Sequence, residues 1–198
     1  MNEIKTAEQK KKEYLREIFG SVELFCICVA VVVIIFTFFF RLSIVDGESM
    51  ENTLHDKEYL VVRTAFYEPA QGDIVVIHDR SLEGLYGNPL IKRVIAVGGQ
   101  TIDIDFNTWT VTVDGVVIDE PYIKLDPMVD LTSAWTYPLE VPEGEVFVMG
   151  DNRDHSGDSR SASVGTVDER CIVGKAALRF FPFDKFGVLE NPFDAAEN

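Results

Sequence analysis

The sequence predicts a mainly β domain that follows a single transmembrane helix. Three observations indicate this fold class. One long apolar run lies near the N-terminus and is free of charge. The rest of the chain contains short runs rich in Val, Ile and Phe, bounded by Gly, Pro or Asp, which are typical of β-strands. Strand-like and helix-like segments do not alternate, so a parallel α/β sheet is disfavoured.

The apolar run is interpreted as a membrane-spanning helix. Residues 24–40 contain no charged side chain. Together with its apolar flanks, this run has nearly the length of about 20 residues that a helix needs to cross a hydrocarbon core of about 30 Å. A cleaved signal peptide would end in small residues, but this run ends in phenylalanines and an arginine. A helix of a globular core would have a polar face, which this run lacks. We expect an N-terminal segment over 1–21, a transmembrane helix over 22–42 and a second domain over 43–198.

Basic residues lie mainly on the N-terminal side of this run. Lys10, Lys11, Lys12 and Arg16 precede it, whereas Arg41 is the only basic residue close behind it. Because positively charged flanks tend to stay in the cytoplasm, we expect a single-pass protein of the cell membrane. Its N-terminus would be cytoplasmic and its large domain extracytoplasmic.

The large domain shows strand signals at short intervals. Residues 101–106 alternate apolar and polar side chains, as a half-buried strand does. Asp114 and Gly115 separate two further apolar runs and fit the two-residue turn of a β-hairpin. The expected strands are 59–63, 73–78, 92–97, 101–106, 109–113, 116–118 and 145–149.

Charge and cysteine content exclude several classes of protein. The formal net charge is −15, so nucleic acid is not an expected partner, since phosphate binding needs a basic surface. Cys26 and Cys28 lie in the apolar run and Cys171 stands alone, so we expect no disulfide framework. No C-x-x-C pair occurs, which argues against a zinc site. We expect neither a metal nor a cofactor.

Three segments stand out from this background, over residues 46–54, 91–99 and 150–160. The first contains Ser49, whose hydroxyl becomes a good nucleophile only with a base beside it. The second contains Lys92 in an apolar run, where burial would disfavour the charged amine and make it a base. The pattern alone favours the alternative, a solvated lysine on an exposed strand face.

The third segment is dense in charge and admits several interpretations. Its aspartates and arginines could pair and fix a rigid turn, or they could form a solvated polar loop. A calcium loop is disfavoured, because Arg153 and His155 stand where EF-hand spacing needs acceptors. A serine–histidine–aspartate triad would need His55, His78 or His155, which we interpret as surface or loop residues.

Taken together, the three segments closely resemble the bacterial type I signal peptidases, or leader peptidases. Residues 49–54 match the S-M-x-P-T-L box of that family, with Asn52 where proline is usual. Residues 92–95 match its K-R-V-I box, and residues 150–160 match its G-D-N-x-x-x-S-x-D-S-R box at each fixed position. The boxes occur in the family order, and the resemblance covers the chain from the membrane helix onward.

The resemblance implies a fold of antiparallel sheets that form a catalytic core, with a small β insert at about 101–142. It implies that Ser49 attacks the scissile carbonyl and that Lys92 accepts the serine proton and later protonates the leaving amine. Ser156 would hydrogen-bond the lysine and orient it. Met50 would lie beside the nucleophile and shape the substrate cleft.

The remaining roles implied by the resemblance are structural. Asp158 and Arg160 would form an ion pair that supports the third segment, and Arg93 and Asp151 would form a second pair. Two departures from the family pattern affect the nucleophile turn. Asn52 in place of proline is expected to loosen it. Gly47 stands where some members carry a serine that donates to the oxyanion, so the second donor beside the Ser49 N–H is left open.

The expected activity is removal of signal peptides with small residues at −1 and −3 from membrane-tethered secretory preproteins, by a monomer at the lipid bilayer. Two alternatives stay open: a serine–lysine peptidase with a narrow substrate set, and a non-catalytic membrane-anchored protein that binds a partner. Ser49 is only nine positions after Phe40 in the chain, so the site lies within about 30 Å of the helix end. Phe180, Phe181 and Phe183 could contact lipid, or they could be ordinary core or strand-end residues.

Overall fold

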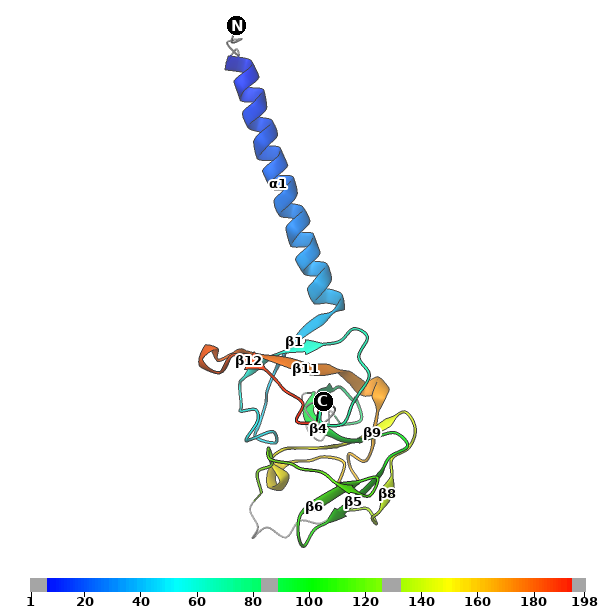
Figure 1. The fold of residues 1–198 in the computed structure, drawn as a ribbon. Helices are drawn as coiled ribbons and strands as arrows, with labels where there is room; N and C mark the ends of the chain where they lie inside the picture. The colour runs from blue at the N-terminus through cyan, green and yellow to red at the C-terminus, as the bar shows by residue number, and fades with distance from the viewer. Residues whose placement is uncertain (1–6, 83–88, 126–132, 194–198) are drawn as a thin grey trace. The chain divides into compact units, whose positions relative to one another are not determined.

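The computed structural model describes residues 7–82, 89–125 and 133–193. The chain divides into two compact units, Met1–Phe40 and Arg41–Asn198, whose elements are labelled in Figure 1. Residues 126–132 of the expected insert lie outside the described residues.

The first unit is the helix α1, Ala7–Phe38, which has 32 residues. Over Gln9–Phe38 it is long and apolar enough to cross a membrane, with a mean hydropathy of 2.8 in an 18-residue window. None of that window is buried against protein. A helix whose apolar side chains are not covered by protein is suited to a lipid environment.

The second unit is built on an eight-stranded sheet, in the order β1-β2-β11-β3-β4-β9-β10 with β12 paired to β11. The registered pairs are antiparallel, for example β4 with both β3 and β9. The strands are β1 (Phe40–Ile44), β2 (Tyr59–Arg63), β3 (Ile74–Ile77), β4 (Leu90–Val97), β9 (Glu145–Met149), β10 (Val167–Asp168), β11 (Ile172–Phe181) and β12 (Gly187–Val188).

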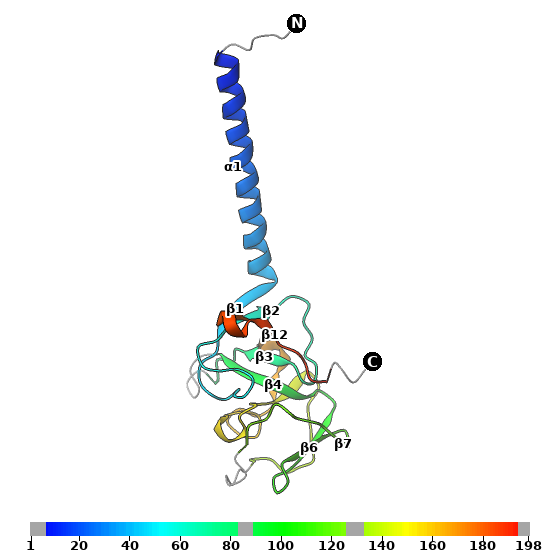
Figure 2. The same ribbon diagram turned by 60° about the vertical axis from the view of Figure 1, so that its left-hand side comes forward.

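A second sheet of four strands lies in the expected insert, in the order β7-β6-β5-β8. Its strands are β5 (Thr101–Asp105), β6 (Thr110–Val113), β7 (Val116–Val117) and β8 (Leu139–Glu140). Asp114 and Gly115 both have positive φ, 51° and 79°, as the expected hairpin turn requires. Within the domain, this sheet lies at the end away from β1 (Figures 1 and 2).

Strand β4 is the centre of the domain. It contributes Ile91 to one buried cluster, Ile95 and Ala96 to a second, and Val94 to a third. The second cluster also contains residues of β5 and β6, so the two sheets share a core. A strand buried on both faces is a rigid support, and β4 is the strand that carries Lys92 and Arg93.

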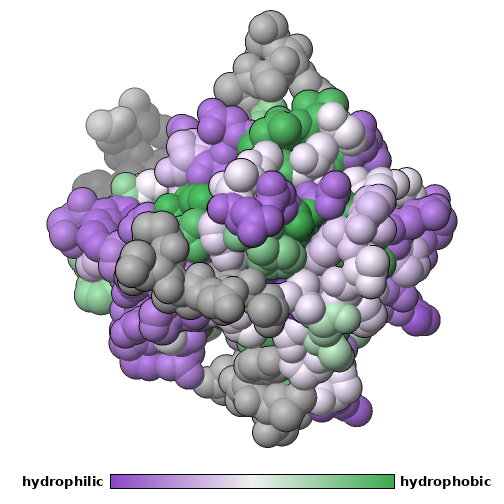
Figure 3. All heavy atoms as spheres, turned by 90° about the horizontal axis from the view of Figure 1, so that it is seen from below, coloured by the Kyte–Doolittle hydropathy of each residue, from purple (hydrophilic) through white to green (hydrophobic). Residues whose placement is uncertain are grey.

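Three short 3-10 helices complete the described elements: η1 (Arg153–His155), η2 (Glu169–Cys171) and η3 (Phe183–Lys185). The domain surface is mixed in character. On the face seen in Figure 3, hydrophilic residues gather at the left and right margins and hydrophobic residues lie between them.

Candidate active site

The structure brings Ser49 and Lys92 together from segments 43 residues apart. Lys92 Nζ donates to Ser49 Oγ over 2.7 Å and to the Ile91 carbonyl over 3.1 Å. Lys92 projects from β4 and is only 2% exposed. A hydroxyl in direct contact with an amine that is shielded from water is the arrangement that a serine nucleophile and its general base require.

Burial lowers the pKa of Lys92 from 10.5 to about 8. Burial disfavours the charged ammonium and is the largest cause. Arg160 lowers the pKa further, whereas the carboxylates of Asp158 and Asp151 raise it. The sequence pattern alone favoured a solvated lysine, and that interpretation is wrong, because the side chain is enclosed by the core around β4.

The turn that carries Ser49 is fixed by its neighbours. Met50 and Leu54 are buried in the core cluster beneath it, and the Leu54 N–H donates to the Met50 carbonyl over 2.8 Å. The Ser49 carbonyl accepts from the Asn152 N–H over 3.0 Å, and the Asn152 side chain donates to the Glu48 carbonyl over 3.0 Å. The third segment is therefore bonded directly to the nucleophile turn.

Arg93 and Asp151 form a buried bidentate ion pair. Arg93 Nε and Nη2 donate to the two carboxylate oxygens over 2.9 and 2.7 Å, and the side chains are 2% and 0% exposed. Arg93 also donates to the Gly72 carbonyl over 2.7 Å, and the Thr53 hydroxyl donates to Asp151. This network joins all three segments singled out in the sequence.

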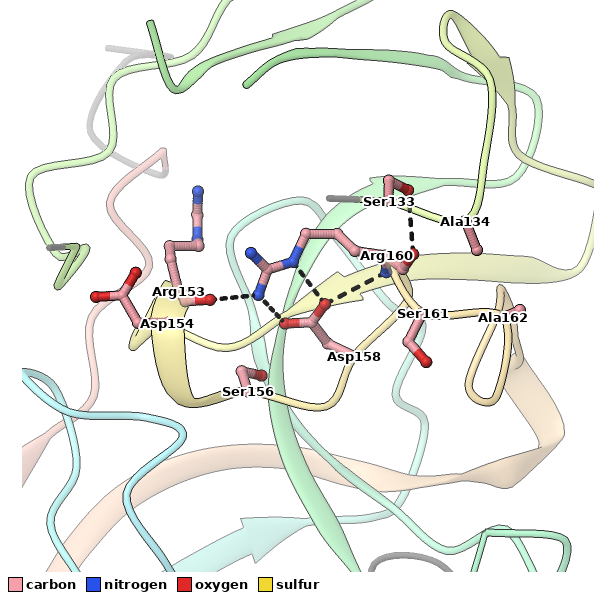
Figure 4. A pocket seen from close by; sticks show the side chains of 9 residues that line it. All are labelled: Ser133, Ala134, Arg153, Asp154, Ser156, Asp158, Arg160, Ser161 and Ala162. Carbon is pink, nitrogen blue, oxygen red and sulfur yellow. Dashed lines mark hydrogen bonds and ion pairs between the residues drawn. The ribbon is translucent and has the colours of Figure 1, made fainter. Parts of the chain in front are cut away.

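Asp158 and Arg160 form a second buried pair, drawn in Figure 4. Two guanidinium nitrogens donate to the carboxylate over 2.8 Å each, and the Gly150 N–H adds a third bond of 3.0 Å. Burial alone would raise the pKa of Asp158, but these donors hold it below its usual value. Arg160 also donates to the Arg153 carbonyl over 2.9 Å, which closes the third segment on itself.

Ser156 does not make the expected bond to Lys92. Its Oγ is buried and has no hydrogen-bond partner among the described residues, while the amine bonds Ser49 and Ile91. Ser156 Oγ lies close against Gly150, where an added Cβ would collide with it and with the Ser49 carbonyl oxygen. Ser156 instead lines a cavity of about 380 Å³ with Asp158 and Arg160 (Figure 4).

A hollow beside the dyad provides an apolar wall. Met50 lines it, with Val45, Leu90 and Ile91. A larger pocket of about 270 Å³ shares Pro89 with it and is lined from β1, β2, β3, β11 and the loops beside them: Arg41, Leu42, Ser43, Val62, Val76, His78, Pro89 and Val173. Small apolar side chains of a bound peptide fit such walls.

Gly47 does not supply the missing oxyanion donor with its backbone. Its N–H donates to the Asp56 carboxylate over 2.9 Å, and its φ of 93° lies in the region that favours glycine. The second oxyanion donor is therefore unassigned among the described residues.

Two groups of residues differ from what the sequence suggested. Phe180, Phe181 and Phe183 are exposed, and Phe183 packs edge to face against each of the other two. The core interpretation is therefore wrong, whereas Phe180 and Phe181 are strand-end residues, because they close β11. Residues 120–124, which the sequence analysis did not single out, lie against the site. The only sequence signal for them is a polar and aromatic stretch that follows the hairpin of the insert.

Comparisons with known proteins point to one family. The family model described as "Signal peptidase, peptidase S26" matches residues 18–181. The chain is 39% identical over 152 residues to the "Probable signal peptidase I-1" of Synechocystis sp., covering 73% of each chain. It is 35% identical over 187 residues to "Signal peptidase I" of Bacillus licheniformis, covering 90% of this chain and 96% of that protein. It is 36% identical over 193 residues to "Signal peptidase I T" of Bacillus subtilis, covering 93% and 94%.

Proposed function

Because the chain belongs to the peptidase S26 family of signal peptidases, we propose that it cleaves signal peptides from secreted preproteins with Ser49 as nucleophile and Lys92 as base. The observation that carries this assignment is the 2.7 Å contact between Lys92 Nζ and Ser49 Oγ on a buried strand. Asp151, Arg93, Asp158 and Arg160 support the dyad through the two buried ion pairs.

The reaction proceeds through an acyl-enzyme. Ser49 Oγ attacks the scissile carbonyl carbon while Lys92 takes the hydroxyl proton. The tetrahedral intermediate collapses to an ester on Ser49, and the C–N bond breaks as Lys92 returns the proton to the leaving amine. Water then attacks the ester carbonyl and gives a proton to Lys92. The bond between Ser49 Oγ and the acyl carbon breaks as Lys92 returns that proton to Ser49 Oγ, and the signal peptide leaves as a carboxylic acid. The Ser49 N–H is one donor for the oxyanion.

The lowered pKa makes this chemistry possible near neutral pH. With a pKa of about 8, roughly a quarter of the Lys92 amines are neutral at pH 7.5. An ordinary lysine would be neutral in only about one molecule in a thousand at that pH. A base poised near the working pH is the condition for efficient proton transfer.

The substrate assignment is tested with a purified preprotein that carries alanine at −3 and −1. The full chain in detergent should cut it once, directly after the −1 alanine, as read by N-terminal sequencing of the product. A matched preprotein with tryptophan at −1 should resist cleavage, because the hollow beside Ser49 is small. Depletion in cells should make many preproteins accumulate. Accumulation of one or a few would identify the narrow-substrate alternative, and no cleavage at all would identify the non-catalytic one.

We also propose that the N-terminus is cytoplasmic and that the domain over 43–198 is extracytoplasmic. The basic residues of α1 lie in its first turns, and Arg41 follows its end. Protease added to intact spheroplasts should degrade the domain and spare an epitope placed before residue 7. Degradation of the epitope instead, with the domain protected, would contradict this orientation.

The protein works as a monomer in this proposal. Ser49, Lys92 and the third segment come from one chain. The net charge of −15 opposes any nucleic-acid partner.

A further inference from the structure

Residues 120–124 form a strap that leaves the hairpin of β6 and β7 and lies between the nucleophile turn and the third segment. We propose that this strap is part of the working site and that Tyr122 is a positioning residue, which holds Arg93 and through it the strand that carries Lys92. The inference rests on the function proposed above, since it concerns the position and the pKa of the proposed base, Lys92.

The strap is bonded to the residues that follow the nucleophile. Asn52 Nδ2 donates to the Ile123 carbonyl over 3.3 Å, and Lys124 Nζ pairs with Glu51 over 2.6 Å. Asn52 stands where the family usually has proline, and from the sequence alone it is expected to loosen this turn. Its side chain instead adds a tie that proline, which has no donor, could not make.

The strap is also bonded to the third segment. The Lys124 N–H donates to the Asp151 carbonyl over 2.8 Å, and the Arg153 N–H donates to the Lys124 carbonyl over 2.9 Å. Lys124 and Asn152 form a parallel β-bridge. The strap therefore behaves as a short extra strand beside the residues that hold the Ser49 carbonyl.

Tyr122 covers the open face of Arg93. The guanidinium carbon lies 3.9 Å from the centre of the Tyr122 ring, while its edges bond Asp151 and Gly72. Stacking on an aromatic face stabilises a guanidinium most when water is excluded, and Arg93 is almost fully buried.

Tyr122 is itself held from the opposite side. Its hydroxyl donates to Glu120 over 2.9 Å. Glu120 bonds Arg153 through both carboxylate oxygens, over 2.5 and 3.1 Å, and both side chains are nearly inaccessible, at 5% and 0%. The contacts thus run from Arg93 through Tyr122 and Glu120 to Arg153, within the segment that also holds Asp158.

This arrangement bears on the base because Arg93 is the residue next to Lys92. The charged groups that act on Lys92 are Asp158 and Asp151, which favour the ammonium, and Arg160, which opposes it. Without the Tyr122 ring, water reaches the guanidinium of Arg93. Arg93 then neutralises the negative charge of Asp151 less effectively. Both changes stabilise the charged form of Lys92 and raise its pKa.

The test compares the full chain in detergent with Tyr122→Ala, Tyr122→Leu and Tyr122→Phe, measuring kcat and KM for the alanine-bearing preprotein from pH 6 to pH 10. The wild-type rate should fall as pH drops below about 8, where Lys92 becomes protonated. Tyr122→Ala and Tyr122→Leu should lower kcat by about 10- to 100-fold with little change in KM, as displacement of a catalytic group does. In the pH–rate profiles of these two variants, the acid limb, where kcat falls as the pH drops, should move to higher pH. Tyr122→Phe keeps the ring and should restore both kcat and the limb.

Val117→Ala, at an exposed position of the same hairpin, is the matched control and should behave as wild type. Near-ultraviolet circular dichroism reports the folded fraction of each variant, and the leucine variant serves if the alanine variant unfolds. Wild-type kcat and an unmoved limb in folded Tyr122→Ala or Tyr122→Leu would overturn the inference. So would a loss of kcat with an unmoved limb, which would mark a merely structural role. Lys92→Ala is assayed alongside: if it stays active, the dyad itself is wrong, whereas an inactive Lys92→Ala with a wild-type Tyr122→Ala refutes the strap alone.

Discussion

Lys92→Ala should abolish preprotein cleavage, with a fall in kcat of about 10⁴- to 10⁶-fold, the range seen when one member of a nucleophile–base pair is removed. The physical reason is that Ser49 Oγ has Lys92 Nζ as its hydrogen-bond partner, at 2.7 Å. Ser49→Ala should lose as much, and the double variant should lose little more, because the two groups act as one unit. The measurement is single-turnover cleavage of the preprotein by the full chain in detergent.

Two controls make this result specific. Lys92→Arg keeps a positive charge but cannot give up its proton near neutral pH, so it should be as inactive as the alanine variant. Lys185→Ala, at a half-exposed lysine far along the chain, should retain wild-type kcat. Near-normal cleavage by Lys92→Ala would show that another group serves as the base.

Asp151→Ala should lower the free energy of unfolding by about 3–5 kcal/mol, because it leaves the guanidinium of Arg93 buried without its counter-charge. Both side chains are almost completely inaccessible, and Asp151 also accepts from Thr53. The loss is measured by denaturant unfolding of the full chain in detergent, followed by the fluorescence of Trp109 and Trp135.

The matched control is Arg170→Ala. Arg170 pairs with Asp168 over 2.5 Å, but its side chain is 90% exposed, and exposed pairs contribute at most about 1 kcal/mol. Replacing both Arg93 and Asp151 by leucine should cost less than Asp151→Ala, since no buried charge is left alone. A change below about 1 kcal/mol for Asp151→Ala would show that Arg93 finds another partner or water.

Local patterns were sufficient to predict the strands of the insert and of the sheet centre. Their signals are short and self-contained, such as the Asp114 and Gly115 turn or the apolar run of β4. Strand β11 was missed because its sequence carries Lys175 and Arg179. Those charges are accommodated by buried acids far away in the chain: Lys175 pairs with Asp73, and Arg179 with Glu58 over 2.8 Å. Such compensation depends on tertiary contacts that no window of sequence contains.

The candidate site, like the fold, was predicted only in part from the sequence. The resemblance of three short boxes was enough to anticipate that Ser49 and Lys92 meet and that Asp158 pairs with Arg160. It did not anticipate that Ser156 Oγ lies against Gly150 and has no hydrogen-bond partner among the described residues. Tyr122 was missed because a tyrosine in a turn has no pattern that distinguishes a stacking partner from a surface residue.

The short link between helix and nucleophile has a consequence for affinity. Helix α1 ends at Phe38, and the eleven residues from there to Ser49 can extend over at most about 40 Å. A preprotein held in the same bilayer by its own signal peptide therefore meets the dyad within a thin layer, at an effective concentration that can reach the millimolar range. Under that confinement a shallow cleft needs little intrinsic affinity, and weak binding lets the cleaved product depart without delay.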